Sequence, residues 1–228
     1  MTYYYKLKKQ LEFWFFQKRF HKTFVFYTSE DEKELSEIYR LRYEVYCEEY
    51  NYLKKENYLN KEESDEYDNE STHFILRDRK NEVVASVRLI MNSSLGFPIE
   101  KHFKIDLHVP VYNRDNLAEI SRLIVSKKYR KKFLLLALLK GIYAVVRHRH
   151  VTHVYAVLDE KLYPVLLNIG FPFKKIGPQS VYQGLTSPYI MDVSEMLEEL
   201  KKKNYLLYRY INNGVLSPGS RETIYAIH

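Results

Sequence analysis

Several residues that mark common protein classes are scarce in this chain. One cysteine, Cys47, occurs among 228 residues, so no internal disulfide can form, and the composition is typical of a reducing compartment. The longest apolar stretch, "FLLLALLKGIYAVV", is interrupted by Lys140 and Gly141 and is too short to span a bilayer. Near the start, Glu12 interrupts "LEFWFF", which leaves no continuous core for a signal peptide. We therefore expect a cytoplasmic protein.

Aromatic residues and positive charge are abundant instead. Apolar residues make up 46% of the chain, with 22 tyrosines and 12 phenylalanines, which is enough for one well-packed domain. The 36 Lys+Arg residues outnumber the 29 Asp+Glu residues, and the formal net charge is +7. An excess of this sign favours an acidic partner, and the candidates are nucleic acid, anionic lipid and an acidic protein.

The pattern along the chain predicts three regions. Residues 1–27 form a basic, aromatic N-terminal arm, residues 28–204 a single domain, and residues 205–228 a C-terminal tail. The apolar helical face expected in the arm consists of Leu7, Leu11, Trp14 and Phe15. This face would either contact a membrane surface or pack on the domain, and the sequence leaves both alternatives open.

Within the domain, the order of helical and strand patterns predicts an α/β (α+β) fold. Ser29, followed by Glu32 at the spacing of a capping box, predicts a helix that runs to about Glu49 and is followed by a polar loop over 50–71. A hairpin, a strand, a helix, a strand, a helix, two strands and a helix are then expected, with a long irregular connection over 92–117. This order predicts a central mixed sheet flanked by helices.

Four acids stand within the six residues "ESDEYD", although the chain as a whole is basic. Two arginines, Arg88 in "VVASVRLI" and Arg122 in "AEISRLIV", lie in otherwise apolar strand patterns, where an unpaired charge is costly. We therefore predict that acids pair with these arginines and leave some negative charge for a substrate amine. The predicted acidic partners are Glu63, Asp65, Asp68 and Glu119.

These residues occur in an order that resembles a family of enzymes. "RYEVYCEE", E-x-D-x-x-D, S-x-R-L and E-I-S-R are similar, from Glu37 to Phe171, to acyl-homoserine-lactone synthases, and more closely to N-acyl amino acid synthases and exosortase-associated acyltransferases. "FPIEKHF" resembles the same relatives, and "LLNIGFPFKKIG" resembles a late segment of GNAT domains. The resemblance implies a GNAT-like acyltransferase fold, an acyl-phosphopantetheine thioester donor on an acyl carrier protein, a small amine acceptor and no permanently bound cofactor. The product would be an N-acyl amino acid.

Two differences from the relatives bear on the expected acceptor and on the expected donor. Tyr46 and Tyr52 fall where the lactone synthases have phenylalanine and tryptophan, which argues against S-adenosylmethionine as the acceptor. The stretch "YRKKFLLL" has no glycine where coenzyme A-dependent GNAT enzymes have a glycine-rich turn that holds the pyrophosphate. The absence of this turn favours a donor on a carrier protein.

A cluster of five basic residues stands at the expected N-terminus of the apolar helix. Cations at this end oppose the helix dipole by ~0.3–1 kcal/mol each, so the cluster favours an anionic partner such as an acidic carrier protein. The cluster consists of Lys127, Lys128, Arg130, Lys131 and Lys132, and a solvated rim is the alternative interpretation. The tract "RHRHVTH" lacks nearby cysteine or carboxylate ligands, so we predict no metal site.

A mechanism can be assigned to these residues as a hypothesis. The acceptor amine must lose a proton before it attacks a thioester, and we predict Glu119 as the base, because a carboxylate in an apolar strand can have a raised pKa. Backbone N–H groups from Leu123 to Ser126 would polarise the thioester carbonyl. Cys47 has no apparent His–acid pair, which favours direct transfer over an acyl-enzyme. The predicted substrate-binding residues are Arg42, Tyr46, Tyr52, Phe74, Phe103, Leu123 and Val125.

Other interpretations remain open from the sequence. The ion pairs would be purely structural, and the aromatic residues ordinary core, if the resemblance did not extend to function. The alternative functions are an acyl-homoserine-lactone-type autoinducer synthase, a coenzyme A-dependent acetyltransferase, and a non-catalytic basic module that binds nucleic acid or membrane. The last would leave the strand arginines unexplained, so we expect no nucleic-acid partner.

Overall fold

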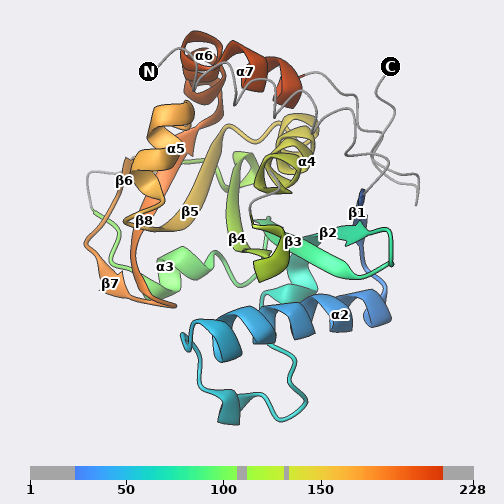
Figure 1. The fold of residues 1–228 in the computed structure, drawn as a ribbon. Helices are drawn as coiled ribbons and strands as arrows, with labels where there is room; N and C mark the ends of the chain where they lie inside the picture. Colours follow the sequence, from blue (N-terminus) through green and yellow to red (C-terminus); the bar gives the residue numbers. More distant parts are fainter. Residues whose placement is uncertain (1–23, 107–111, 131–133, 213–228) are drawn as a thin grey trace, which may run out of the picture.

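The computed structural model describes residues 24–106, 112–130 and 134–212, and one mixed sheet organises this part of the chain (Figure 1). The strand order is β1-β2-β3-β4-β5-β8-β6, and β7 also pairs with β8. β4 and β5 are parallel, whereas the other paired strands are antiparallel. The bounds are β1 Phe24–Ser29, β2 Ser71–Asp78, β3 Val83–Met91, β4 Leu117–Val125, β5 His153–Asp159, β6 Lys174–Lys175, β7 Ser180–Val181 and β8 Leu185–Asp192.

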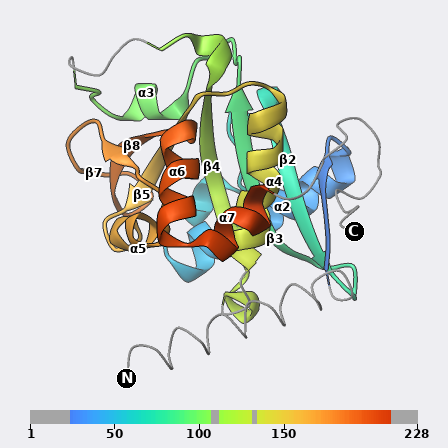
Figure 2. The same cartoon turned by 90° about the horizontal axis from the view of Figure 1, so that it is seen from above.

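Helices cover both faces of the sheet, as the sequence predicts. α4, α6 and α7 pack on one face over a large apolar core that includes Leu138, Ile142 and Leu200, while α2 and α3 lie on the other face (Figures 1 and 2). The bounds are α2 Glu32–Tyr43, α3 Pro98–His102, α4 Leu134–His148, α5 Tyr163–Ile169, α6 Val193–Lys203 and α7 Tyr205–Asn212. A π-helical segment, η1 Glu44–Glu49, continues α2, so the predicted end near Glu49 is confirmed.

The start of α2 differs from the prediction. Asp31 is the N-cap, because its side chain accepts the backbone N–H groups of Lys33 and Glu34 at 3.1 Å each. Ser29 instead ends β1, and its hydroxyl binds the Glu34 carboxylate. The predicted Ser29 cap is therefore wrong, because pairing with β2 keeps Ser29 in the sheet.

The limits of the domain also lie further out than the sequence indicates. Residues 24–27, assigned to the N-terminal arm, belong to β1 and pair with β2. Residues 205–212, assigned to the C-terminal tail, form α7, in which Leu207 and Ile211 are buried. Residues 1–23 of the predicted arm and 213–228 of the predicted tail lie outside the described residues.

The centre of the sheet has two irregularities, a bulge in β4 and an early end of the pairing between β4 and β5. Arg88 of β3 pairs with Ser121, but Ser86 pairs with Ile124, so β4 has an extra residue in a bulge at Arg122, whose φ is 51°. The parallel ladder between β4 and β5 ends at Ile120 and Ala156. Beyond these residues the two strands separate.

Candidate active site

The acids of "ESDEYD" and two buried arginines form a continuous set of ion pairs. Arg42 of α2 donates to Glu63 through Nε and to Asp68 through Nη1, the latter at 2.7 Å. Arg88 of β3 donates through Nη1 to Asp68 at 2.8 Å and to Asp65 at 2.5 Å. Both guanidinium groups are fully buried, so helix α2 and strand β3 are joined through the loop that carries the acids.

Arg122 completes this set from the bulge of β4. Its Nη2 lies 2.9 Å from Glu63 and 2.8 Å from Asp65, and its guanidinium sits over the Tyr46 ring at 5.7 Å. Its Nη1 donates to Gln183, in the turn before β8, at 3.3 Å. The predicted pairing of the acids with Arg88 and Arg122 is therefore confirmed for Glu63 and the aspartates.

The charges of this lattice balance, which the sequence did not predict. Three guanidinium groups face three carboxylates, so no surplus negative charge is left in the lattice for an amine. The neighbouring acids also have partners: Glu62 pairs with Arg40 at 3.1 Å, and Glu66 pairs with Lys101 at 2.5 Å. The acidic run therefore serves mainly to neutralise buried arginines.

The pKa values of the lattice aspartates reflect these contacts. Burial by itself would raise the pKa of Asp68, but the guanidinium groups of Arg42 and Arg88 outweigh burial and hold that pKa well below its usual range. Asp65 behaves in the same way, and its pKa is lowered by Arg88 and Arg122 against the effect of burial. Both carboxylates are therefore charged at neutral pH.

Glu119 lies on β4 apart from the lattice. Its carboxylate accepts the Ile99 backbone N–H at 3.0 Å, and no ion pair among the described residues includes it. Burial raises its pKa to about 8, although the Ile99 hydrogen bond and the charges of Arg88 and Arg122 lower it in part. Glu119 is fully buried and does not line the cavity at the gap between β4 and β5.

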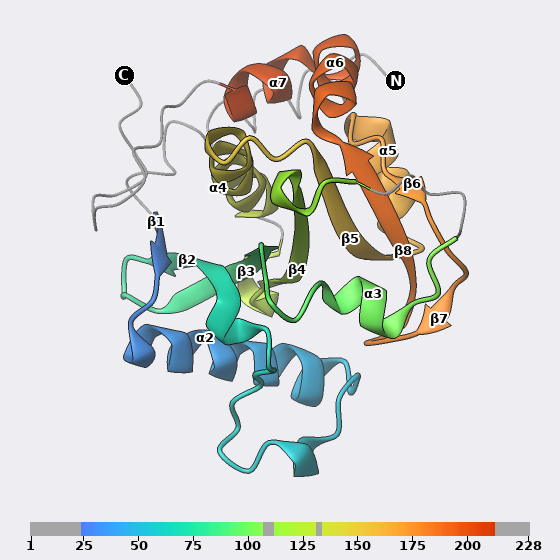
Figure 3. The ribbon, with the colours of Figure 1, turned by 180° about the vertical axis from the view of Figure 1, so that it is seen from behind.

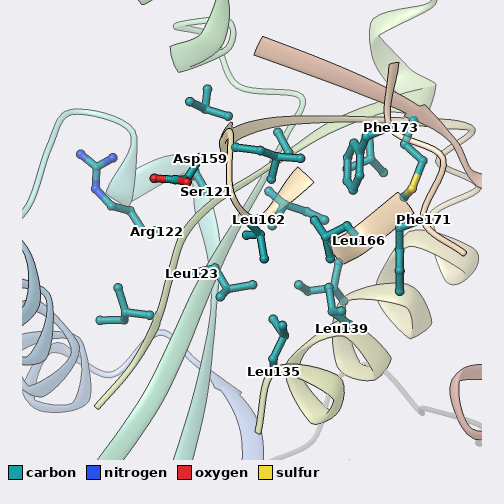
Figure 4. Close-up of a pocket in the computed structure, with 18 of the residues that line it drawn as sticks. Ser121, Arg122, Leu123, Leu135, Leu139, Asp159, Leu162, Leu166, Phe171 and Phe173 are labelled. Carbon is teal, nitrogen blue, oxygen red and sulfur yellow. The ribbon is translucent and has the colours of Figure 1, made fainter. Parts of the chain in front are cut away.

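A cavity of about 760 Å³ opens where β4 and β5 separate. Tyr46, Tyr50 and Tyr52 line it together with Arg122, and this end is the outer one because Tyr50 and Tyr52 are exposed. Ser121 and Asp159 face the cavity from the two strands (Figure 4). Its inner wall is apolar. This wall includes Leu135, Leu139, Leu162, Leu166, Phe171 and Phe173.

Several predicted substrate-binding residues do lie on this cavity. Tyr46, Tyr52, Leu123 and Val125 line it. Arg42 does not, because its side chain is buried among the acids of the lattice.

The two predicted phenylalanine walls are wrong. Phe74 stacks on Phe26 at 5.7 Å in the core beneath α4, because strand alternation in β2 turns it to that face. Phe103 contacts Tyr182 edge-on at 5.5 Å on the opposite side of the sheet. Neither residue lines the cavity.

Sequence reasoning missed two polar residues at the cavity. Ser121 accepts a hydrogen bond from Arg88 Nε at 3.0 Å, and its place in "EISR" beside the arginine was the available signal. Asp159 ends β5 and accepts the Lys161 N–H at 2.7 Å. Among the described residues that line the cavity, it is the one that carries a carboxylate. An acid directly after the apolar strand "VTHVYAVL" was the signal for Asp159.

The segment after β4 bears on two predictions, namely the backbone donors for the thioester carbonyl and the basic docking cluster. The Ser126 N–H donates to Val84 O at 2.8 Å, so it is unavailable to a thioester oxygen, and the role of Leu123 to Val125 as donors stays a prediction. Arg130 is engaged with Glu49 through both terminal nitrogens and lies over the Tyr50 ring at 5.1 Å. Its charge is therefore already paired with Glu49, and its assignment to a docking cluster stays a prediction.

Two of the four lysines in the basic cluster lie in the part of the chain that the structure describes. Lys127 and Lys128 are exposed on the short turn Lys127–Tyr129, and Lys131 and Lys132 lie outside the described residues. In the described ranges, no three His, Cys, Asp or Glu side chains are placed to hold a metal ion. No described helix is long and apolar enough to cross a membrane.

A mixed sheet whose parallel central strands separate around an apolar cavity defines the fold class as GNAT-like. An acetyltransferase of the GNAT family from Staphylococcus aureus Mu50 superposes with a TM-score of 0.51 and 12% identity, over 75% of this chain and 99% of that chain. The family described as "N-acyl amino acid synthase FeeM" matches residues 37–193. The chain belongs to this family, and the resemblance and fold class expected from the sequence are confirmed.

Two further solved structures share the fold. FeeM, an N-acyl amino acid synthase from uncultured soil microbes, superposes with a TM-score of 0.60 and 14% identity, over 80% of this chain and 98% of that chain. BjaI, a CoA-dependent acyl-homoserine lactone synthase solved with SAM and isopentyl-CoA, gives a TM-score of 0.65 and 18% identity, over 79% and 88% of the two chains. A search of curated protein sequences gave no match.

Family membership establishes the general reaction. The protein is an N-acyltransferase that makes N-acyl compounds, and its family uses acyl thioester donors without a permanent cofactor. The alternative of a non-catalytic basic module is therefore wrong.

Proposed function

We propose that this enzyme transfers a fatty acyl group from an acyl carrier protein thioester to the amine of an amino acid, giving an N-acyl amino acid. The observation that carries this proposal is the cavity of about 760 Å³, which is apolar inside and polar at the strand gap. An apolar wall of this extent suits an acyl chain, because buried apolar surface stabilises by about 25 cal/mol per Å². Ser121, Arg122 and Asp159 at the gap supply polar contacts for a charged acceptor.

The donor assignment is supported by the segment after β4. Coenzyme A would need free backbone N–H groups there for its pyrophosphate. Instead, the Ser126 N–H is bonded to Val84 O at 2.8 Å, and the segment has no glycine. A carrier protein presents a phosphopantetheine with one phosphate and can be held by exposed Lys127 and Lys128 instead.

The proposed reaction is a direct transfer. The protonated acceptor amine first gives one proton to the base, which later releases it to solvent, and the neutral amine then attacks the thioester carbonyl. The carbon–sulfur bond breaks, and the second proton of the attacking nitrogen passes to the departing thiolate, which leaves an amide and a free thiol. We assign the proton acceptor to the ionised form of Glu119, whose pKa of about 8 lies near neutral pH, and a water molecule would relay the proton from the gap. Arg88 and the acids Glu63, Asp65 and Asp68 are positioning residues that hold Arg122 at the gap. Backbone N–H groups of Leu123 to Val125 polarise the carbonyl.

The test is reconstitution with defined substrates. Purified enzyme is incubated with palmitoyl carrier protein or palmitoyl-coenzyme A and a mixture of the common amino acids, and products are identified by mass spectrometry. We expect N-palmitoyl amino acids, formed at higher kcat/KM from the carrier protein. Product only with S-adenosylmethionine would make the enzyme an autoinducer synthase, and a preference for coenzyme A would overturn the donor assignment.

A peripheral membrane contact through the N-terminal arm is a separate part of the proposal. Its support is the basic, aromatic composition of residues 1–23, which suits an anionic lipid surface. Sedimentation with vesicles of 30% phosphatidylserine, with and without these residues, tests it. Equal binding of both forms would show that these residues make no contact with the membrane.

A further inference from the structure

The cavity extends well past the gap between β4 and β5. It continues between α4 and α5 and reaches Met196 of α6 and Ile211 of α7, both beyond the family match that ends at residue 193. Figures 1 and 3 show α6 and α7 at the opposite end of the molecule from α2, whose continuation η1 carries Tyr46 at the outer end of the cavity. Met196 and Ile211 therefore lie at the inner end.

Helix α7 is anchored well enough to serve as a wall. Asn204 caps its first turn, since the Asn204 side chain accepts the Leu207 N–H at 3.2 Å. At the other end, the Tyr143 hydroxyl of α4 donates to Asn212 Oδ1 at 3.3 Å, and Tyr143 itself lines the cavity. Leu207 and Ile211 are equally buried, but of these two Ile211 lines the cavity and Leu207 does not.

We propose that Ile211, together with Met196, forms the floor of the acyl site and thereby sets the preferred length of the acyl chain. This inference rests on the proposed transfer of a fatty acyl group. A methylene that still fits adds about a factor of four in affinity. A methylene that meets the floor forces side chains out of their rotamers and reverses the gain. Isoleucine is stiff because it is β-branched, which gives the floor a defined position.

The test compares the chain-length profiles of variants. Saturated fatty acids of 8 to 18 carbons are bound to the full chain and scored by the rise in Tm, and the matching acyl carrier proteins compete in one transfer reaction. Ile211→Trp should move the optimum to shorter chains, with at least a tenfold loss for the longest chain that the unaltered protein accepts. Ile211→Ala and Met196→Ala should move it to longer chains.

Leu207→Ala is the matched control on the same helix. It should lower the Tm through lost packing but leave the profile unchanged, because Leu207 does not face the cavity. Unchanged profiles in Ile211→Ala and Met196→Ala would overturn the inference, even if Ile211→Trp fails to fold. Fatty-acid binding that follows the floor variants without any N-acyl amino acid product would instead overturn the proposed function alone.

Discussion

Arg40 and Arg42 stand two positions apart on α2, yet they face opposite environments. Arg40 is 62% exposed and pairs with Glu62, whereas Arg42 is fully buried between Glu63 and Asp68. Removing one partner of a buried pair leaves the other charge uncompensated, so Arg42→Ala should destabilise by roughly 3–5 kcal/mol. Arg40→Ala should cost less than about 1 kcal/mol. Urea unfolding of both variants checks this, and similar losses would show that the lattice is solvated.

Glu119 offers a test by pH. Its folded pKa of about 8 exceeds the ordinary value of 4.5, so the folded state holds a proton that the unfolded state releases between these pH values. Stability should therefore fall as pH rises from about 4.5 to 8, by up to ~1.4 kcal/mol per unit. Glu119→Gln carries no such proton, so its stability relative to the unaltered protein should increase across this window. Parallel curves from pH 5 to 8.5 would mean that Glu119 is solvated.

The same residue is predicted to act in catalysis. Glu119→Gln should keep the fold and lower kcat by about 10²–10⁴-fold, because the proton acceptor is gone. Asp159→Asn is the informative comparison, since Asp159 lies on the cavity and Glu119 does not. A small effect in Glu119→Gln with a large one in Asp159→Asn would transfer the role of base to Asp159.

At the scale of elements, Gly141 fixes how closely α4 approaches β1. A Cβ at this position would overlap the ring of Phe26, which is buried and stacked on Phe74. Alanine improves helix propensity by about 1 kcal/mol, but overpacking costs typically 1–3 kcal/mol, so Gly141→Ala should lower the Tm. Adding Phe26→Leu should recover part of that loss. Additive losses in the double variant would show that the helix simply moves away.

Some of the helices and strands could be predicted from local sequence patterns, and others could not. The hairpin of β2 and β3 and the glycine that ends α5 were predicted correctly, because two apolar runs separated by the short polar stretch "RKN" and the position of Gly170 are local signals. α7 was missed because eight residues with a modest apolar pattern resemble a tail until α4 and α6 are there to bury Leu207 and Ile211. The Ser29 cap failed for a similar reason, since β2 retains that residue in the sheet.

At the scale of the whole molecule, the net charge of +7 favours docking of an acidic carrier protein. Charge reversal at the proposed docking site tests this. Reversing Lys127 and Lys128 to Glu should raise the KM for the carrier protein and barely change activity with a short thioester. The effect should shrink at high salt, because exposed charges are screened beyond a Debye length of about 8 Å.

Reversal of Lys201 and Lys202 on α6 is the matched control, because the charge change is the same at a distant site. Equal increases in KM from both pairs would indicate a general effect of net charge. Equal losses with both donors from the first pair would assign Lys127 and Lys128 to the chemistry or the fold.

The sequence by itself determined the β2–β3 hairpin and the order β4, α4, β5 and α5 after it, the family, and the pairing of the acidic run with buried arginines. These follow from periodicity, from motif spacing and from the cost of an unpaired buried charge. Only the tertiary structure decided that β4 and β5 separate after Ile120, that Phe74 and Phe103 point away from the resulting cavity, and that Asp159 and Ile211 reach it. The physical reason is that a cavity wall depends on strand register and on helices far away in the chain, and neither is encoded in a short stretch of residues.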